Sequence, residues 1–248
     1  MQERGCPQYY FHRTGLAIFD HGTESGKEVL TPGFKTSYSQ LPATLPVFPL
    51  NGVLLLPNGR LPLNIFEARY LSMTDDALAS DRLIGMIQPT AGHTNAQVPE
   101  LYPTGCAGRI TQFMETSDGR YSITLTGVAR FDIGQEIDSM RGYRRVVPDW
   151  TRYRDDFEPA ADPHFDRDHL LGVLKLYFSN NGIEADWEAI ERTEGSRLIT
   201  TLAMICPFDP PEKQALLLAE ASEERAKTMI ALMEMANHLT NGRDDAKH

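Results

Sequence analysis

The chain has 248 residues, of which 41% are hydrophobic and 23% are charged, and this composition is typical of a globular protein with one large domain or two small ones. No stretch approaches the roughly 20 consecutive apolar residues of a membrane span, and the first residues hold no apolar segment typical of a secretory signal. The net charge of −10 is uneven: residues 1–148 hold 14 acidic and 13 basic side chains, whereas residues 149–248 hold 20 and 11. The second half is therefore expected to repel nucleic acid and anionic membranes.

The three cysteines, Cys6, Cys106 and Cys206, are far apart and form no C-x-x-C pair. A sparse, odd-numbered set argues against both a disulfide framework and a cysteine-based zinc site. The set indicates a reducing, cytoplasmic protein.

Residues 1–40 are polar and show no sustained helical or strand period, so they are predicted to form a flexible leader. The segment "GTESGKE" within them imitates a phosphate-binding loop. It has three residues between its glycines where the motif needs four, and Glu28 follows Lys27 where a Ser or Thr would hold magnesium. No nucleotide site is predicted there.

Residues 41–150 are predicted to form a β-rich region. The runs "LPVFPL", "GVLLLP" and "RLIGMIQP" are short, apolar and bounded by Pro, Asn or Gly, as strands often are. Two extended runs flank Asp118 and Gly119, a dipeptide that favours a tight hairpin turn. In the second run, from Tyr121 to Ile133, apolar residues alternate with mostly polar ones such as Arg130. With "YRRVVPDW" as a further strand and one helix, the pattern predicts an antiparallel, barrel-like sheet.

Residues 151–242 are predicted to form an α-helical bundle, followed by a disordered tail at 243–248. Asp162 is the expected cap of a helix that begins at Pro163 and ends at Gly182. Short helices are expected at "DWEAIERT" and "SRLITTLAMIC". Asp209 and Glu212 have the spacing of a capping box. The last helix shows one apolar stripe: Ala226, Met229, Ile230, Met233 and Ala236.

The stretch "LPLNIFEARYLSM" contains a charged cluster at an expected helix start. Asn64 and Glu67 have the N-x-x-E spacing in which the Asn caps the helix and the Glu bonds back to the cap. Tyr70, Met73 and Ala77 would then form a buried stripe. No second carboxylate or histidine lies near Glu67 in the sequence, so a structural role is favoured over acid–base catalysis.

The segment "DPHFDRDH" gathers side chains that bind metals elsewhere: Asp162, His164, Asp166, Asp168 and His169. Its histidines are five residues apart, whereas the metalloprotease motif places them at i and i+4, and the pattern of a calcium loop is absent. Acidic residues are common at helix starts because they complement the helix dipole, so this interpretation is favoured.

No G-x-S-x-G motif of a serine hydrolase is present. A Ser–Lys or Cys–His pair dispersed along the sequence stays open, although Lys175 lies in an apolar helix and Cys106 lies in a strand, where both have structural explanations. No catalytic residue, metal ligand or cofactor is predicted, and the chain is expected not to be an enzyme.

Two segments are candidates for RNA binding. The "GCAG" segment at 105–108 leads into a strand, whereas a G-x-x-G clamp joins helices. The segment "RGYRR" supplies a candidate RNA contact patch of Arg141, Arg144 and Arg145, but a charge-protected sheet edge explains these arginines equally well. RNA binding by a PUA-like sheet is therefore the alternative function, and nucleic acid is not the expected partner.

The segment "LPVFPLNGVLLLPNGRLPLNIFEARYLSM" followed by "DRLIGMIQP" resembles the N-terminal substrate-binding domain of Lon proteases. It is most similar to the short bacterial proteins that carry this domain alone. The later "GCAGRI", "DGRYSITLTGVARF" and "YRRVVPDW" fall where that family has paired strands, and "DPPEKQALLLA" looks like its helix in the bundle. The resemblance covers residues 43–240. The family-motif residues, which are expected to be structural, are Phe48, Pro49, Asn64, Phe66, Glu67, Arg69 and Tyr70.

The resemblance implies an α+β fold, with a PUA-like antiparallel β pseudo-barrel followed by a C-terminal helical bundle. It implies no activity, because the ATPase and Ser–Lys protease modules of Lon follow this domain and the chain shows no Walker motif. The implied function is recognition of unfolded or tagged polypeptides as an adaptor in protein quality control. The implied partner is such a polypeptide, or a protease or ligase as in the related domain of cereblon. No membrane partner is expected.

A peptide could add to an exposed strand edge, and the loop at 90–104 is the predicted rim of the binding surface. Four prolines are expected to mark strand edges or ends, since proline cannot donate to a ladder: Pro46, Pro49, Pro57 and Pro62. A small hydrolase with a dispersed site is the third hypothesis.

Overall fold

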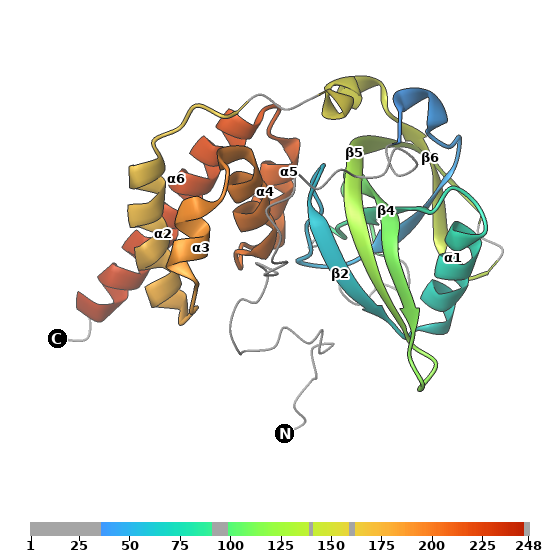
Figure 1. The fold of residues 1–248 in the computed structure, drawn as a ribbon, viewed down its shortest axis with the longest axis horizontal. Coiled ribbons are helices and arrows are strands. Elements are labelled where there is room, and N and C mark those ends of the chain that lie inside the picture. The colour runs from blue at the N-terminus through green and yellow to red at the C-terminus, as the bar shows by residue number, and fades with distance from the viewer. Residues whose placement is uncertain (1–35, 91–98, 139–140, 159–161, 246–248) are drawn as a thin grey trace. The chain divides into compact units, whose positions relative to one another are not determined.

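The computed structural model describes residues 36–90, 99–138, 141–158 and 162–245 (Figure 1). The predictions for residues 1–35 of the leader, 91–98 of the loop and 246–248 of the tail lie outside the described residues. Two compact units are present: the described residues within 36–165 and 194–232 belong to the first, and residues 166–193 with 233–245 belong to the second. The helices predicted as one region at 151–242 are thus shared between the two units.

The first unit is built on a six-stranded sheet with the strand order β2-β5-β4-β3-β1-β6. Strand β6 pairs with β5 as well as with β1, so five strands close on themselves while β2 pairs only with β5. The pairs are antiparallel except for β1 with β3. The predicted pseudo-barrel is confirmed. Its strands are β1 (Leu45–Pro49), β2 (Arg60–Ile65), β3 (Leu83–Ile87), β4 (Thr104–Glu115), β5 (Tyr121–Ile137) and β6 (Arg144–Asp149).

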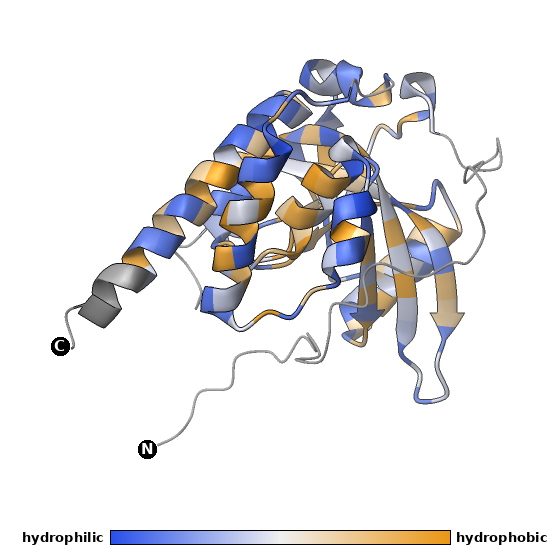
Figure 2. Ribbon diagram, turned by 60° about the vertical axis from the view of Figure 1, so that its left-hand side comes forward, coloured by the Kyte–Doolittle hydropathy of each residue, from blue (hydrophilic) through white to orange (hydrophobic). Residues whose placement is uncertain are grey.

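Strand β5 organises the sheet because it pairs with β2, β4 and β6. Its alternation is confirmed in the apolar positions, since Ile123, Leu125 and Phe131 are buried. Phe131 also packs against Trp150 with ring centroids 5.7 Å apart. The tight turn before β5 is confirmed as well: Gly119 has a φ of 78°, which a glycine adopts without strain. The loop at this turn is hydrophilic (Figure 2).

Two predictions at the start of the sheet are wrong. Asn64 does not cap α1 (Ala68–Leu78), because it lies in β2 opposite Ser122. The N-cap position is taken by Glu67, whose side chain makes no capping hydrogen bond. Pairing of six β2 residues with β5 outweighs the local capping preference. The run "GVLLLP" is a loop rather than a strand, although Leu54, Leu55 and Leu56 are buried.

The helix predictions differ mainly in where the helices begin. Asp162 is not the cap of the helix expected from Pro163. That helix begins four residues later, because the Asp166 carboxylate accepts from the His169 N–H at 2.9 Å and acts as the cap. Its end at Gly182 is confirmed, with a φ of 63°. The capping box of Asp209 and Glu212 is confirmed. The helices are η2 (Tyr38–Gln40), η3 (Thr151–Phe157), α2 (Arg167–Asn181), α3 (Trp187–Arg192), α4 (Gly195–Ile205), α5 (Pro210–Leu218) and α6 (Ser222–Asp245).

A buried polar network joins the sheet to α5. Arg130, which the alternation placed on the polar face of β5, is only 5% exposed. Its guanidinium forms an ion pair with Asp156 at 2.7 Å and donates to the carbonyls of Leu217 and Ala219 at 3.1 and 2.7 Å. Arg225 donates to the carbonyls of Leu216 and Ala219. The two arginines therefore satisfy the last carbonyls of α5, at the negative end of its dipole.

The charges of this network are strongly affected by burial. Burial, together with the nearby positive charge of Arg130, lowers the pKa of Arg225 to about 10. Burial also acts to lower the pKa of Arg130, but the hydrogen bonds and charge of Asp156 outweigh it and raise that pKa. Lys213 of α5, also buried, donates to the Gly52 carbonyl at 2.7 Å, which ties the helix to the loop before β2.

The loop at 51–59 passes so close to β5 that a side chain at Gly127 would overlap the carbonyl of Leu56. We expect Gly127→Ala to lower the free energy of unfolding by about 3 kcal/mol, since the obstacle is main chain and cannot move aside like a flexible side chain. Urea denaturation followed by the fluorescence of Trp150 and Trp187 measures this loss. The matched control is Gly172→Ala in α2, where an added Cβ meets no described atom within 4 Å and should raise stability by up to about 1 kcal/mol. Equal stability of Gly127→Ala and the wild type would contradict the close approach.

Asp156→Ala is expected to lower the free energy of unfolding by about 3 to 5 kcal/mol, because it leaves the buried Arg130 guanidinium without its counter-charge. Thermal and urea unfolding of the same samples measure the effect. Asp155→Ala is the matched control: this neighbouring carboxylate is exposed, and its loss should change stability by about 0.5 kcal/mol or less. Similar effects of the two substitutions would show that the network does not stabilise the unit.

Candidate polypeptide-binding surface

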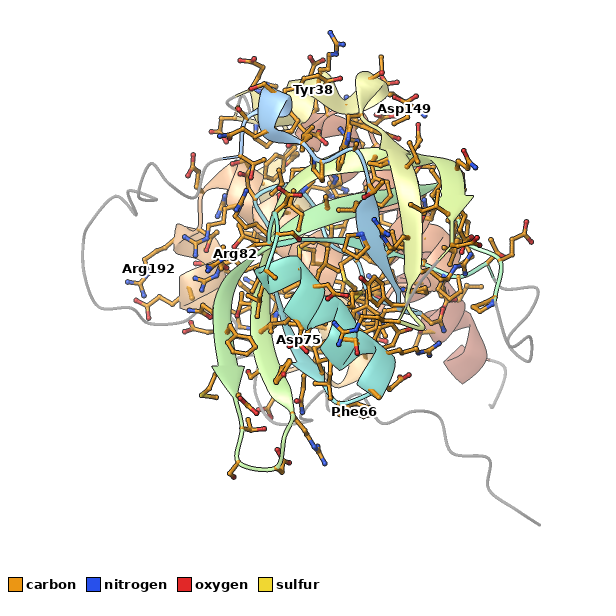
Figure 3. The ribbon with its side chains drawn as sticks, turned by 90° about the vertical axis from the view of Figure 1, so that its right-hand side faces the viewer. Tyr38, Phe66, Asp75, Arg82, Asp149 and Arg192 are labelled. Atoms are coloured by element: carbon orange, nitrogen blue, oxygen red, sulfur yellow. The ribbon has the colours of Figure 1, made fainter. Side chains whose placement is uncertain are left out.

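Three strands continue beyond the closed part of the sheet. Strand β3 pairs with β4 only as far as Arg109, and β6 pairs with β5 only from Asp132 onward. Beyond these points β4 and β5 pair with each other, and β5 also pairs with β2. The three strands form a ribbon that ends in the turn at 116–120 (Figure 1). The N-terminus of α1 follows β2 at the same end of the unit, where Figure 3 shows Phe66.

Large apolar side chains are exposed at this end. Phe66 is 51% exposed, Phe113 is 44% exposed and Met114 is 59% exposed. The ring of Phe113 lies 5.0 Å from that of Tyr121 in an edge-to-face contact, and the guanidinium of Arg120 lies 5.9 Å from the ring of Phe66. We call these five residues the ribbon-end surface. Phe113 and Met114 are neighbours in β4, so these apolar side chains are exposed on both faces of the ribbon. Large exposed apolar side chains on a folded domain are typical of an interaction site.

Two exposed ion pairs lie next in sequence to residues of the ribbon-end surface. Arg69 pairs with Glu67 at 2.9 Å, and Arg120 pairs with Asp118 at 3.0 Å. A hydrogen bond from the Thr116 hydroxyl lowers the pKa of Asp118. These pairs are exposed and contribute little to stability.

The family-motif residues divide into buried and exposed groups. Phe48 and Tyr70 are buried, with ring centroids 4.1 Å apart, and Pro49 ends β1 opposite Ile87. The remaining four lie nearer the surface: Asn64, Phe66, Glu67 and Arg69.

Sequence reasoning did not single out Phe113, Met114, Arg120 or Tyr121 as site residues. The available signal was the pair of apolar residues directly before an exposed hairpin turn, in "TQFMETSDG", where polar residues usually protect a strand.

The arginines of "RGYRR" are engaged inside the first unit. Arg141 pairs with Asp76 at 2.6 Å, Arg144 pairs with Glu136 at 2.6 Å, and Arg145 donates to the Thr44 hydroxyl at 2.9 Å. The candidate RNA contact patch is therefore partly neutralised by carboxylates, which reduces its attraction for phosphate.

The residues of "DPHFDRDH" do not converge on a metal site. Asp166 caps α2, and His169 pairs with Glu234 of α6 at 3.0 Å in the second unit. In the part of the chain that the structure describes, three or more His, Cys, Asp or Glu side chains nowhere gather as a metal site would require. Asp162, His164 and Asp168 have no metal-binding arrangement either.

The cysteines that the structure describes are not placed for nucleophilic chemistry. Cys106 and Cys206 are buried free thiols, and burial raises the pKa of both well above the ordinary range. A neutral, inaccessible thiol is a poor nucleophile. Lys175, the lysine of the candidate Ser–Lys pair, lies 3.6 Å from Glu191 and over the ring of Trp187.

Among the described residues, no helix is both long and apolar enough to cross a membrane.

The geometry defines a PUA-like α+β domain with an exposed apolar ribbon end. A family model of the ATP-dependent protease La (LON) substrate-binding domain matches residues 44–235. The chain therefore belongs to the Lon substrate-binding domain family, as the sequence motifs predicted. The matched region is the substrate-binding part of Lon, which is not its catalytic part.

Solved structures show the same fold at low sequence identity. The Lon N-terminal domain protein from Xanthomonas campestris matches with a TM-score of 0.53 and 23% identity, covering 76% of this chain and 97% of that one. The N-terminal domain of the Mycobacterium avium complex Lon protease matches with a TM-score of 0.52 and 16% identity, covering 77% of this chain and 98% of that one.

Curated relatives are full Lon proteases. Lon protease 2 of Myxococcus xanthus is 30% identical over 205 residues, which are 78% of this chain and 24% of the relative. The Lon protease of Haemophilus influenzae is 24% identical over 196 residues, with coverages of 77% and 24%. The chain thus spans about a quarter of the length of these relatives.

We expect Tyr143→Phe to raise the pKa of Asp76. The hydroxyl of Tyr143 donates to this carboxylate at 2.7 Å and is the main reason that the pKa of Asp76 is lowered, with Arg141 acting in the same direction. A lowered pKa in the folded state stabilises the fold at pH values above the unfolded value of about 3.9, and this contribution is lost as the pH falls through the folded value. Carboxyl-carbon NMR titration measures the pKa directly. Tyr102→Phe is the control, and an unchanged Asp76 pKa in Tyr143→Phe would refute the assignment.

Proposed function

We propose that this protein binds exposed segments of unfolded or tagged polypeptides in the cytoplasm, without catalysing a reaction, as an adaptor in protein quality control. Membership of the Lon substrate-binding domain family is the observation that carries the proposal. The ribbon-end surface supports it, because Phe66, Phe113 and Met114 offer apolar area that a folded domain would otherwise bury.

The energetics of such a surface suit weak and reversible binding. Burying one large apolar side chain contributes about 1.5 to 3 kcal/mol, and association costs several kcal/mol of lost freedom. A few side chains of this kind are therefore expected to give micromolar rather than nanomolar dissociation constants. Weak contacts with many sequences are what recognition of unfolded chains requires.

The RNA-binding alternative has less support. Arg141 and Arg144 are paired with carboxylates, and the second half of the chain is strongly acidic. Both features weaken the attraction for a phosphate backbone.

The proposal predicts that the purified protein binds reduced and carboxymethylated α-lactalbumin, labelled with a fluorophore, in the absence of ATP. Replacing Phe66, Phe113 and Met114 together by Ser should weaken this binding at least about tenfold, because such a change needs only about 1.4 kcal/mol. Fluorescence anisotropy measures the dissociation constants.

The control variant carries Val147→Ser and Leu218→Ser, which remove apolar side chains of the first unit that are 39% and 36% exposed. It should bind the unfolded chain like the wild type. Native α-lactalbumin should not bind to any of the proteins. Lack of binding by the wild type would remove the proposed function, whereas equal binding by the triple variant would exclude the ribbon-end surface.

A further inference from the structure

The register of the ribbon determines which main-chain groups of β4 face outward. The N–H of Thr116 donates to the carbonyl of Arg120 at 2.8 Å, so these two residues form a hydrogen-bonded pair. Hydrogen-bonded and non-hydrogen-bonded pairs alternate along an antiparallel ladder. Met114 opposite Ser122 is then hydrogen-bonded as well, and Phe113 opposite Ile123 is not. Phe113 and Glu115 therefore direct their N–H and C=O groups away from β5.

Nothing in the described part of the chain pairs with this outer edge. The ladder between β3 and β4 ends at Arg109, and the N–H of Ile110 donates to the carbonyl of Arg82 at 2.8 Å. Beyond Ile110, the described residues supply no main-chain hydrogen bond to the outward groups of Phe113 and Glu115. Two donors and two acceptors are thus presented in the geometry of a strand.

The opposite edge of the ribbon, formed by β2, is protected. The N–H of Gly127 donates to the carbonyl of Gly59 at 2.8 Å, and continuing the alternation places Leu61, Leu63 and Ile65 in hydrogen-bonded pairs with β5. Pro62 therefore faces outward, where a residue without an N–H blocks the addition of another strand. The ribbon thus has one protected edge, formed by β2, and one open edge, formed by the unpaired end of β4.

The side chains at the open edge favour an apolar occupant. Phe113 and Met114 point to opposite faces of the ribbon and are both exposed. An added strand would place its side chains alternately on the two faces of the ribbon, beside Phe113 on one face and beside Met114 on the other. Residues 112–115 hold no proline, and Glu115 is their one charged side chain, so this edge carries little of the protection that natural edge strands usually have.

We propose that residues 112–115 of β4 bind an extended polypeptide segment by strand addition, in which the segment pairs with the main chain of Phe113 and Glu115. The occupant is an unfolded segment with apolar side chains at alternate positions, because only an extended chain matches both the spacing of the free groups and the alternation of Phe113 and Met114. This inference rests on the proposed function and specifies the conformation of the bound chain.

Glu115→Pro tests the open edge. It removes an outward N–H and no ladder bond to β5, and it should weaken binding of the labelled unfolded chain at least fivefold. Glu115→Gln keeps the N–H and removes only the charge, and Asn64→Pro adds a second proline to the protected edge of β2. Both controls should bind within twofold of the wild type, and the unfolding midpoints of all variants should agree.

A second measurement uses the unaltered protein, so that it does not depend on the folding of a variant. The probe is a labelled decapeptide of alternating Val and Thr, compared with the same peptide N-methylated at every second residue on one edge or on the other. Methylation of one edge should abolish binding, since strand addition uses one edge of the segment. Equal affinity of all three peptides would overturn the inference.

The outcomes separate this inference from the proposed function. If Glu115→Pro binds like the wild type while the triple serine variant does not bind, strand addition is wrong and side-chain contacts alone carry recognition. If the wild type binds no unfolded chain, the proposed function fails. A wild-type dimer that Glu115→Pro dissociates, measured by light scattering, would show that a second copy occupies the edge and would overturn the peptide assignment.

Discussion

The ion pair of Arg130 with Asp156 is the interaction on which the first unit depends. Arg130 lies on β5, the strand that pairs with three others, and its guanidinium reaches the final carbonyls of α5. One side chain therefore links the centre of the sheet, the helix η3 and the end of α5. Because the guanidinium is buried, loss of the Asp156 carboxylate would leave a charge without its counter-charge. The directional hydrogen bonds also fix α5 against the sheet more specifically than apolar packing would.

With the sheet closed and covered in this way, few strand edges are left over. Strands β1, β3 and β6 have neighbours on both sides, and β5 has β4 on one side and β2 or β6 on the other. In the described sheet, strand β2 has a neighbour on one side only, and the end of β4 beyond Ile110 has no strand on its outer side. The unpaired end of β4 therefore coincides with the ribbon end, where the exposed apolar side chains also lie.

Much of the fold was predictable from local patterns. The alternation along β5, the Asp-Gly turn and the capping box at Asp209 each depend on neighbouring residues, and all three are confirmed. The errors arose where contacts with residues distant in the sequence determine the local structure. Asn64 has the spacing of a helix cap, yet pairing with β5 draws it into a strand. Arg130 has the position of a surface residue, yet its partners lie 26 and 87 to 89 residues away in the chain.

The ribbon-end surface was less predictable for the same physical reason. Phe113 and Ile123 look equivalent in the sequence, since both are apolar residues of predicted strands. Only the strand order shows that Ile123 lies on the central strand of the ribbon, between β2 and β4, while Phe113 opposite it lies on an outer strand. The prolines were informative in one respect, because Pro62 does lie on an outer edge. The absence of proline from residues 112–115 acquires meaning only once the register shows that this edge is unpaired, and so the open edge is a property of pairing rather than of composition.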